Sequence, residues 1–117
     1  MTSDTFIADY FAEIYRNVCE IDQSDLHSII QRLKLVSNNN GKVIIIGNGG
    51  SATIASHVSV DLTKAAGIRA INFNESSLLT CFANDYGYED WVAMALHFYA
   101  DAGDAVILIS SSGTSPN

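Results

Sequence analysis

The spacing of apolar residues along the chain predicts two helices at its start. Apolar side chains recur every three or four positions over residues 4–21 and again over 26–36, so each segment presents an apolar face. Asp22 or Ser24 can cap the second helix, and the run "SNNNGK" after it contains Asn and Gly residues suited to a helix end. We therefore expect a helical pair over residues 1–40.

From residue 41 the pattern changes to short apolar runs separated by helical segments. The runs "KVIII", "IRAINFN" and "DAVILIS" lack a regular polar alternation, which is typical of strands buried on both faces of a parallel sheet. The helices expected between them cover residues 52–66, Ser76 or Ser77 to Phe82, and 89–100. This order predicts an α/β fold of three αβα layers, with a doubly wound parallel sheet after two N-terminal helices. Three strands make an unusually small sheet of this kind. We therefore expect residues 41–117 to form only the first half of the sheet, within a single domain over residues 1–117.

Composition narrows the functional class. The chain has 117 residues, enough for one domain, and its apolar runs are far shorter than the ~20 residues of a membrane span. Its formal net charge of -7 and its 6 scattered Lys and Arg residues disfavour a nucleic-acid surface, which needs clustered basic groups. The first residues include neither a basic stretch nor a small-residue cleavage site, so we expect no signal peptide.

The cysteines and the first helix bear on location and assembly. Cys19 and Cys81 are far apart in the sequence and have no metal-like spacing, so we expect reduced thiols, in the core or half-buried, in a cytoplasmic protein. The first helix is apolar on more than one side, with Phe6, Tyr10 and Phe11 among its residues. Such a surface needs a second layer, which predicts a homo-oligomer.

The first candidate site is the run "GNGGSA", which directly follows the apolar run that ends at Ile46. Its glycines let backbone N–H groups approach an anion, the next helix presents its positive end, and Ser51 adds a hydroxyl. This combination favours a phosphate site over a tight turn without a ligand. The run also satisfies the G-x-G-x-x-A form of the dinucleotide pattern. That alternative needs an acidic residue at the end of the next strand, and Glu75 lies a few residues late.

The second candidate site follows the third apolar run. Five hydroxyl side chains surround Gly113, and they are Ser110, Ser111, Ser112, Thr114 and Ser115. Ligands of open parallel sheets lie at the carboxyl ends of the strands, so we expect this loop and the glycine loop at the same edge. Hydroxyls and backbone amides can hold a phosphate without lysine. The alternative is a polar, frayed end of the chain.

Together, the segments "GKVIIIGNGGSA", "FANDYGYE" and "ILISSSGTSPN" resemble the signatures of the sugar isomerase (SIS) domain, and most closely its phosphoheptose isomerase branch. The resemblance spans essentially the whole chain and corresponds to the N-terminal part of the family's domain. It implies a flavodoxin-like SIS fold and an aldose–ketose isomerase that converts sedoheptulose 7-phosphate to heptose 7-phosphate for heptose and surface-polysaccharide synthesis. It also implies a dimer or tetramer with sites between subunits, and no nucleotide cofactor.

The same resemblance assigns roles to residues of this chain. It places Asn48, Gly49, Gly50 and Ser51 along the substrate, Ser110, Ser112 and Ser115 around the phosphate, and Asn84 and Asp85 in the sugar cleft. It makes His57 and Asp61 ligands of a zinc ion, and Asp61 also the catalytic base, where the family carries Glu. From the residues alone, a His and a carboxylate four positions apart share a helix face, and both a bound zinc and an ordinary surface pair stay open.

The family's second catalytic group is a His in the C-terminal half, with a Gln nearby, and this sequence has no counterpart of either. His27 and His97 lie among helix residues and do not replace it. Two alternatives to the isomerase therefore stay open. One is a non-catalytic SIS domain that binds a sugar phosphate or a protein partner. The other is a dinucleotide-binding half with affinity for NAD.

Overall fold

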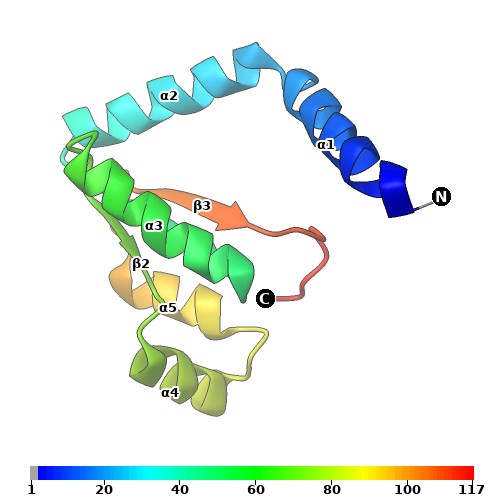
Figure 1. The fold of residues 1–117 in the computed structure, drawn as a ribbon. Coiled ribbons are helices and arrows are strands. Elements are labelled where there is room, and N and C mark those ends of the chain that lie inside the picture. The colour runs from blue at the N-terminus through cyan, green and yellow to red at the C-terminus, as the bar shows by residue number, and fades with distance from the viewer. Residues whose placement is uncertain (1–2) are drawn as a thin grey trace. The chain divides into compact units, whose positions relative to one another are not determined.

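The computed structural model describes residues 3–117, which divide into two compact units, one up to Gln31 and one from Arg32 to Asn117. The elements in chain order are α1 (Ser3–Cys19), α2 (Gln23–Asn38), β1 (Val43–Gly47), α3 (Gly50–Lys64), β2 (Ala70–Asn72), α4 (Ser76–Tyr86), α5 (Trp91–Tyr99) and β3 (Ala105–Ile109) (Figure 1). This is the predicted order of elements. None of these helices is long and apolar enough to cross a membrane.

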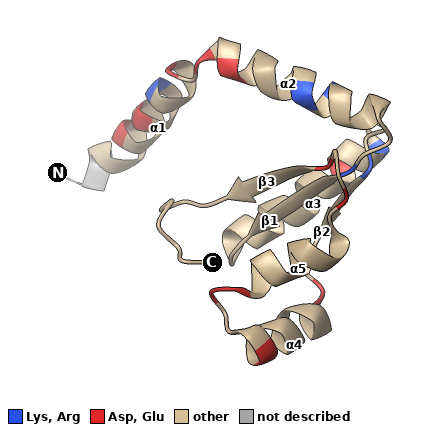
Figure 2. Ribbon diagram, turned by 180° about the vertical axis from the view of Figure 1, so that it is seen from behind, with Lys and Arg blue, Asp and Glu red and all other residues tan. Residues whose placement is uncertain are grey.

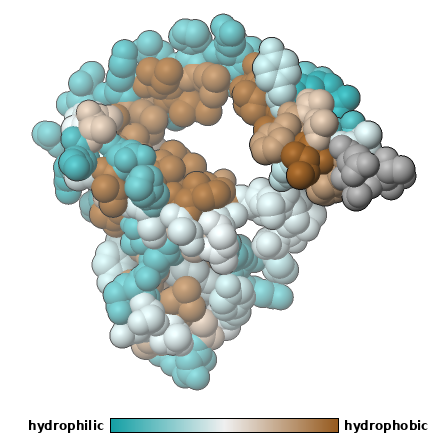
Figure 3. Space-filling model, in the orientation of Figure 1, coloured by the Kyte–Doolittle hydropathy of each residue, from teal (hydrophilic) through white to brown (hydrophobic). Residues whose placement is uncertain are grey.

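The first unit contains α1 and the first half of α2, and it has no buried core of its own. Every side chain of residues 5–31 is exposed. Figure 3 shows apolar surface along both helices. The more exposed large apolar residues here are Phe6, Ile7, Tyr10, Phe11, Tyr15 and Val18. Asp22 caps α2, because its carboxylate accepts a hydrogen bond of 2.7 Å from the Ser24 N–H. The Ser24 hydroxyl and the Ser24 N–H together hold the pKa of Asp22 below its usual value.

The second unit is built on a three-stranded parallel sheet in the order β2-β1-β3. β1 is the central strand, and Val43 lies opposite Ala70 on one side and Ala105 on the other. Because all three strands point the same way, the segments that follow them leave from one edge of the sheet. Both candidate loops are therefore at this edge, as the sequence predicts.

Helices cover both faces of β1. On one face Ile44 and Ile46 pack with Phe73 and with Trp91 and Val92 of α5, while α4 lies against the same cluster. On the other face the core residues are Val43, Ile45, Ala55 of α3 and Val36 of α2. The predicted three-layer α/β fold with a parallel sheet is thus confirmed.

The cover over β3 is incomplete within the described part of the chain. Val106 and Leu108 alternate with the residues that face α3, so they lie on the face where α5 packs. They are 43% and 69% exposed, respectively. α4 and α5 therefore cover β1 and leave much of this face of β3 open.

Two expectations from the sequence were wrong in detail. α4 runs one turn further than Phe82 and ends before Gly87, whose φ of 87° suits glycine, so Asn84 and Asp85 lie on a helix and not in a loop. Cys19 and Cys81 are both free and exposed, although the sequence led us to expect them in the core or half-buried. The reason is that Cys19 ends a helix without a core, and Cys81 lies on an outer face of α4.

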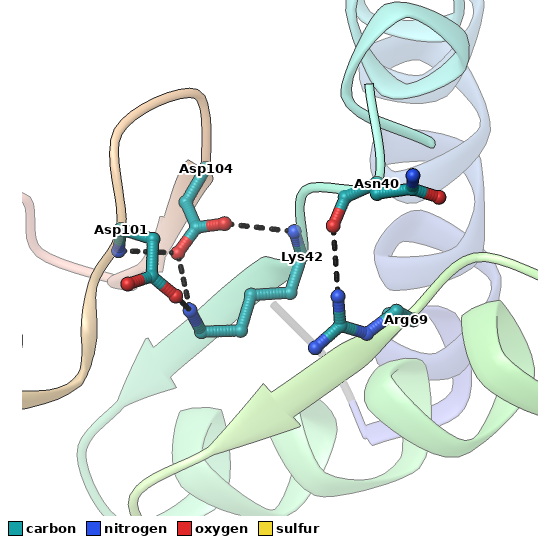
Figure 4. Close-up of polar contacts among 5 residues, drawn as sticks. All are labelled: Asn40, Lys42, Arg69, Asp101 and Asp104. Atoms are coloured by element: carbon teal, nitrogen blue, oxygen red, sulfur yellow. Dashed lines mark hydrogen bonds and ion pairs between the residues drawn. The ribbon is translucent and has the colours of Figure 1, made fainter. Parts of the chain in front are cut away.

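An ionic cluster ties together the amino ends of β1 and β3 (Figure 4). The Lys42 Nζ donates to Asp101 Oδ2 and to Asp104 Oδ2, each at 2.6 Å. The Lys42 N–H also donates to Asp104 Oδ1 at 2.8 Å. Nearby, Arg69 donates to the backbone oxygen of Asn40 at 2.7 Å. Only 4% of the Asp104 side chain is exposed, so this carboxylate depends on Lys42 for its counter-charge.

The same contacts shift two pKa values in opposite directions. The hydrogen bonds to Asp101 and Asp104 raise the pKa of Lys42 above its ordinary value of 10.5. Burial by itself would raise the pKa of Asp104, but hydrogen bonds from the Asp101 N–H and from Lys42 outweigh it, and this pKa lies below its ordinary 3.8.

Replacing Lys42 with Met should lower the free energy of unfolding by about 2 kcal/mol, because a buried carboxylate loses its charged donor. Urea denaturation at pH 7 measures this, with Lys34→Met as the matched control, since Lys34 is exposed and has no ion pair in the described residues.

The stabilisation that comes from the cluster should depend on pH. The contribution of Asp104 to the free energy of unfolding is present above pH 3.8 and is lost as the pH falls through the lowered folded-state pKa. The Lys42 contribution is present below pH 10.5 and is lost as the pH rises through the raised folded-state pKa. A difference between wild type and Lys42→Met that stays constant from pH 2 to pH 12 would contradict this account.

Candidate functional site

The loops that follow β1 and β3 border a cavity of about 430 Å³ at the carboxyl edge of the sheet, and this cavity is open to one side. Its apolar wall consists of Ile46, Val92, Leu108 and Ile109. The other residues that line the cavity are polar or glycine, and they are Gly47, Asn48, Ser51, Ser110, Ser111, Ser112, Gly113, Ser115 and Asn117. No charged residue lines this cavity, and Figure 2 shows neither blue nor red on the two loops.

Glycine is required at two positions of the first loop. A Cβ on Gly47 would lie 2.6 Å from the backbone carbon and oxygen of Ser51, so only glycine allows the chain to turn back this closely. Gly49 has a φ of 54° and a ψ of -121°, a conformation that other residues rarely adopt. α3 begins directly after it without a side-chain cap, so no side chain competes with a ligand for the positive end of the helix.

The second loop is held by its own hydroxyls. Ser110 Oγ accepts from the Gly113 N–H at 2.9 Å, and Ser112 Oγ accepts from the Thr114 N–H at 3.2 Å. Each hydroxyl oxygen is thereby fixed by a backbone donor, and each O–H hydrogen remains available to donate to a ligand. Two of the three predicted phosphate-binding serines are thus oriented before any ligand arrives.

The structure brings five of the predicted substrate residues to the cavity. They are Asn48, Ser51, Ser110, Ser112 and Ser115. Gly49 and Gly50 belong to the same loop without lining the cavity, and a Cβ on either would meet nothing within 4 Å. The space beside these two glycines is therefore open to a ligand.

Asn84 and Asp85 lie elsewhere, on the last turn of α4. Asn84 Nδ2 donates to Asp85 Oδ1 at 2.9 Å, and Cys81 Sγ lies 3.7 Å from Asp85 Oδ2. Neither residue lines the cavity between the two loops. Asn84 and Asp85 therefore contact each other and Cys81, and the structure does not bring them to the serine loop.

His57 and Asp61 share one face of α3, as their spacing predicts. His57 Nε2 lies 3.7 Å from Asp61 Oδ1, and the side chains are 80% and 63% exposed. Asp61 follows Ser51 by three helical turns, about 15 Å along the axis at 1.5 Å per residue. Within one chain, this carboxylate is therefore remote from the cavity.

The zinc that the resemblance implies can be tested against the donors at this pair. An imidazole and a carboxylate are suitable ligands, but a zinc site needs at least three protein donors. Residues 3–117 contain no group of three or more His, Cys, Asp or Glu side chains that could hold a metal ion. The described residues thus supply two donors and do not by themselves form a zinc site.

The loop after β2 gives no support to the dinucleotide alternative. The Glu75 carboxylate accepts from the Ser77 and Leu78 N–H groups at 3.1 and 2.8 Å, which caps α4 and lowers the pKa of Glu75. Asn74 Nδ2 donates to the backbone oxygen of Ala52 and to Ser56 Oγ, both at 2.7 Å. The acidic residue that a ribose would need is therefore used as a helix cap.

Two residues beside the site, Tyr88 and Asn117, were not among the site residues predicted from the sequence. The Tyr88 hydroxyl donates to Asn48 Oδ1 at 3.2 Å, and the side-chain amides of Asn117 and Asn48 donate to each other. Asn117 falls in the segment "SSGTSPN", so its place near the second loop could be anticipated. No sequence signal indicates that Tyr88 reaches a residue 40 positions earlier.

Comparison with known proteins gives consistent results. The family model described as SIS domain matches residues 7–117. The phosphoheptose isomerase of Helicobacter pylori strain P12 is 38% identical over 104 residues, which are 84% of this chain and 52% of that protein. The phosphoheptose isomerase of Thermodesulfovibrio yellowstonii is 34% identical over 95% of this chain and 62% of its own. The chain thus spans about half the length of the curated relatives it matches.

Two solved structures share the fold. The phosphoheptose isomerase of Neisseria gonorrhoeae superposes with a TM-score of 0.88 at 30% identity, over 99% of this chain and 65% of that one. The phosphoheptose isomerase of Francisella tularensis gives a TM-score of 0.84 at 29% identity, over 100% of this chain and 65% of that one.

Gly47→Ala should lower the free energy of unfolding by about 1–3 kcal/mol, because the new Cβ overlaps the backbone of Ser51. Gly50→Ala is the matched control. Its Cβ meets nothing within 4 Å, and alanine in a first helical turn is neutral or stabilising. Urea denaturation of both variants measures the difference, and equal stabilities would contradict the close approach of Gly47 to Ser51.

Proposed function

The chain belongs to the SIS domain family, and on that basis we propose that the protein carrying it is a sugar-phosphate isomerase that interconverts sedoheptulose 7-phosphate and heptose 7-phosphate. Its products would serve heptose and surface-polysaccharide synthesis. The names of the relatives support the reaction, and the observation that carries the proposal is the cavity between the two loops. Two exposed free cysteines, Cys19 and Cys81, support a reducing, cytoplasmic location.

The cavity suits a phosphate by donor chemistry and not by charge. Ser110 and Ser112 keep their O–H hydrogens for a ligand, Ser51 adds a hydroxyl at the start of α3, and the helix end adds a partial positive charge. Without Lys or Arg in the lining, we expect modest affinity and easy release. Those properties suit a substrate that must leave after each turnover.

Isomerisation of a ketose to an aldose is a proton transfer that conserves all atoms. A base removes a proton from C1 of the ketose, the O1 proton is lost, O2 gains one, and the carbon proton returns at C2. We propose Asp61 as this base, because a carboxylate is the usual choice for such a proton and Asp61 lies where the family has Glu. His57, 3.7 Å away, would hold the carboxylate in position.

The distance along α3 places a condition on this mechanism. Asp61 is about 15 Å from Ser51 along the helix axis, and it does not line the cavity of its own chain. We therefore propose a homo-oligomer, a dimer or tetramer, in which Asp61 of one copy meets the loops of another. The exposed apolar residues of α1, among them Phe6, Ile7 and Phe11, support assembly.

The described residues offer only part of the ligand set that a zinc ion needs. His57 and Asp61 would supply two ligands, and others would have to come from outside the described residues. Because the described residues do not complete a site, the reaction above uses no metal step.

A non-catalytic sugar-phosphate-binding domain is the second candidate. Two observations favour it: Asp61 has a shorter side chain than the Glu of the family, and no described His reaches the cavity as a second acid–base group. The cavity and its donors would be the same in this case. Only turnover separates the two candidates.

Asp61→Asn should lower the turnover number for sedoheptulose 7-phosphate at least about 100-fold, because general-base catalysis contributes that order. Binding measured by titration calorimetry should change little, since the donors proposed to hold the phosphate come from the two loops and not from Asp61. Glu89→Gln is the matched control, because Glu89 is an exposed carboxylate outside the site. Binding without turnover in the wild type would establish the non-catalytic candidate, and absence of sugar-phosphate binding would overturn both.

Mixing two inactive variants should restore activity if the site lies between subunits. In mixed dimers of Asp61→Asn and Ser112→Ala, one of the two sites has both intact groups, so about a quarter of wild-type activity should return. Light scattering before and after mixing gives the oligomer size. Mixed oligomers that form without regaining activity would place Asp61 and the loops of one chain in the same site.

A further inference from the structure

Among the cavity residues, Asn48 is the one whose side chain makes the most hydrogen bonds to other described side chains. Its Oδ1 accepts from the Tyr88 hydroxyl at 3.2 Å and from Asn117 Nδ2 at 3.3 Å. Its Nδ2 donates to Asn117 Oδ1 at 2.9 Å. Tyr88 lies between α4 and α5, and Asn117 lies beyond the serine loop. One side chain thus connects three segments that are far apart in the sequence.

These contacts use nearly all the hydrogen-bonding capacity of the Asn48 carboxamide. An amide oxygen has two lone pairs, and both have a donor here. The amide nitrogen has two hydrogens, and one is donated to Asn117. The other hydrogen has no acceptor among the described residues. Toward a ligand in the cavity, Asn48 can therefore donate but not accept.

We infer that Tyr88 and Asn117 are positioning residues, which hold the Asn48 amide in the orientation that offers only an N–H to the substrate. This inference rests on the proposed function. Without Tyr88 and Asn117, the amide could turn over and present its oxygen instead. That oxygen would repel a phosphate oxygen and would attract a sugar hydroxyl.

The neighbouring groups have the same polarity. Ser110 Oγ and Ser112 Oγ each accept a backbone N–H, so their hydroxyls also have hydrogens to donate. Asn48 completes a set of donors contributed by both loops around one cavity. A set of fixed donors selects an oxygen that carries negative charge, and it discriminates against a neutral group that must itself donate.

Tyr88 can be changed to test this role without disturbing the hydrophobic core. It is 52% exposed, and its hydroxyl is bonded to Asn48, so removing the oxygen should leave the core intact. Tyr86 provides the matched control, since it is 41% exposed, packs its ring against Phe82 and has no hydrogen bond from its hydroxyl among the described contacts.

The experiment compares Tyr88→Phe and Tyr86→Phe with the wild type in the intact protein. Titration calorimetry with sedoheptulose 7-phosphate and with inorganic phosphate should show binding weakened about 3- to 10-fold in Tyr88→Phe, the effect of one neutral hydrogen bond, and unchanged in Tyr86→Phe. In turnover assays, KM should rise by the same factor while kcat stays within about twofold, because a positioning contact of this kind acts on binding. Equal affinity of wild type and Tyr88→Phe would overturn the inference.

Side-chain amide resonances in ¹⁵N-labelled protein separate this inference from the proposed function. In Tyr88→Phe the resonances of the Asn48 and Asn117 amides should shift, while the backbone resonances of β1 stay in place. Unchanged side-chain resonances would overturn the positioning role even if sugar phosphate binds. Shifted resonances in a protein that binds neither ligand would support the contact and overturn the sugar-phosphate function.

Discussion

The burial of β1 is the constraint on which the rest of the second unit depends. Val43, Ile44 and Ile45 are fully buried, which requires helices on both faces and a strand on each side. A strand in this environment cannot tilt or slide without moving both cores, because its alternate side chains belong to different clusters. Gly47 ends this strand, so the glycine loop starts from a position set by the two cores. The serine loop starts at the same level because Gly47 is paired with Ile109.

The two ends of the sheet have different electrostatic characters. At the amino end, Lys42 is fixed between Asp101 and Asp104, and its charge is balanced within the cluster. At the carboxyl end, the two loops carry neutral hydroxyls, amides and backbone N–H groups. A chain with a formal charge of -7 would repel an anion, and keeping carboxylates out of the cavity lining limits that repulsion. Salt should accordingly affect ligand affinity less than it does in a lysine-based site.

Much of the architecture could be predicted because it depends on local rules. Runs such as "KVIII" have a strong preference for buried strands, and glycines at 47 and 49 are needed for the backbone itself, so the strand and its loop follow from the sequence. The spacing of His57 and Asp61 likewise determines that they share a helix face. The end of a helix is harder to predict from local sequence. α4 continues past Phe82 to Tyr86, so Asn84 and Asp85 belong to the helix.

The contacts that could not be predicted are those between distant segments. Tyr88 and Asn48 are 40 positions apart, and nothing in either local sequence indicates the pairing. The remoteness of Asp61 from the cavity of its own chain is similar. The resemblance implies sites between subunits, but no residue pattern in the sequence shows which groups come from different copies. The exposure of Cys81 depends on which face of α4 turns outward, and the sequence of this short helix alone does not decide it.

The open side of β3 has a consequence for how this polypeptide behaves in solution. In the described part of the chain β3 pairs only with β1, its outer edge has free backbone groups, and its sequence "AVILI" is apolar throughout. Val106 and Leu108 add exposed apolar surface on the uncovered face. An uncharged edge strand of this kind, without proline, is a template for edge-to-edge association. While this edge is bare, during synthesis or refolding, the polypeptide is therefore exposed to aggregation and depends on prompt covering of β3 or on chaperones.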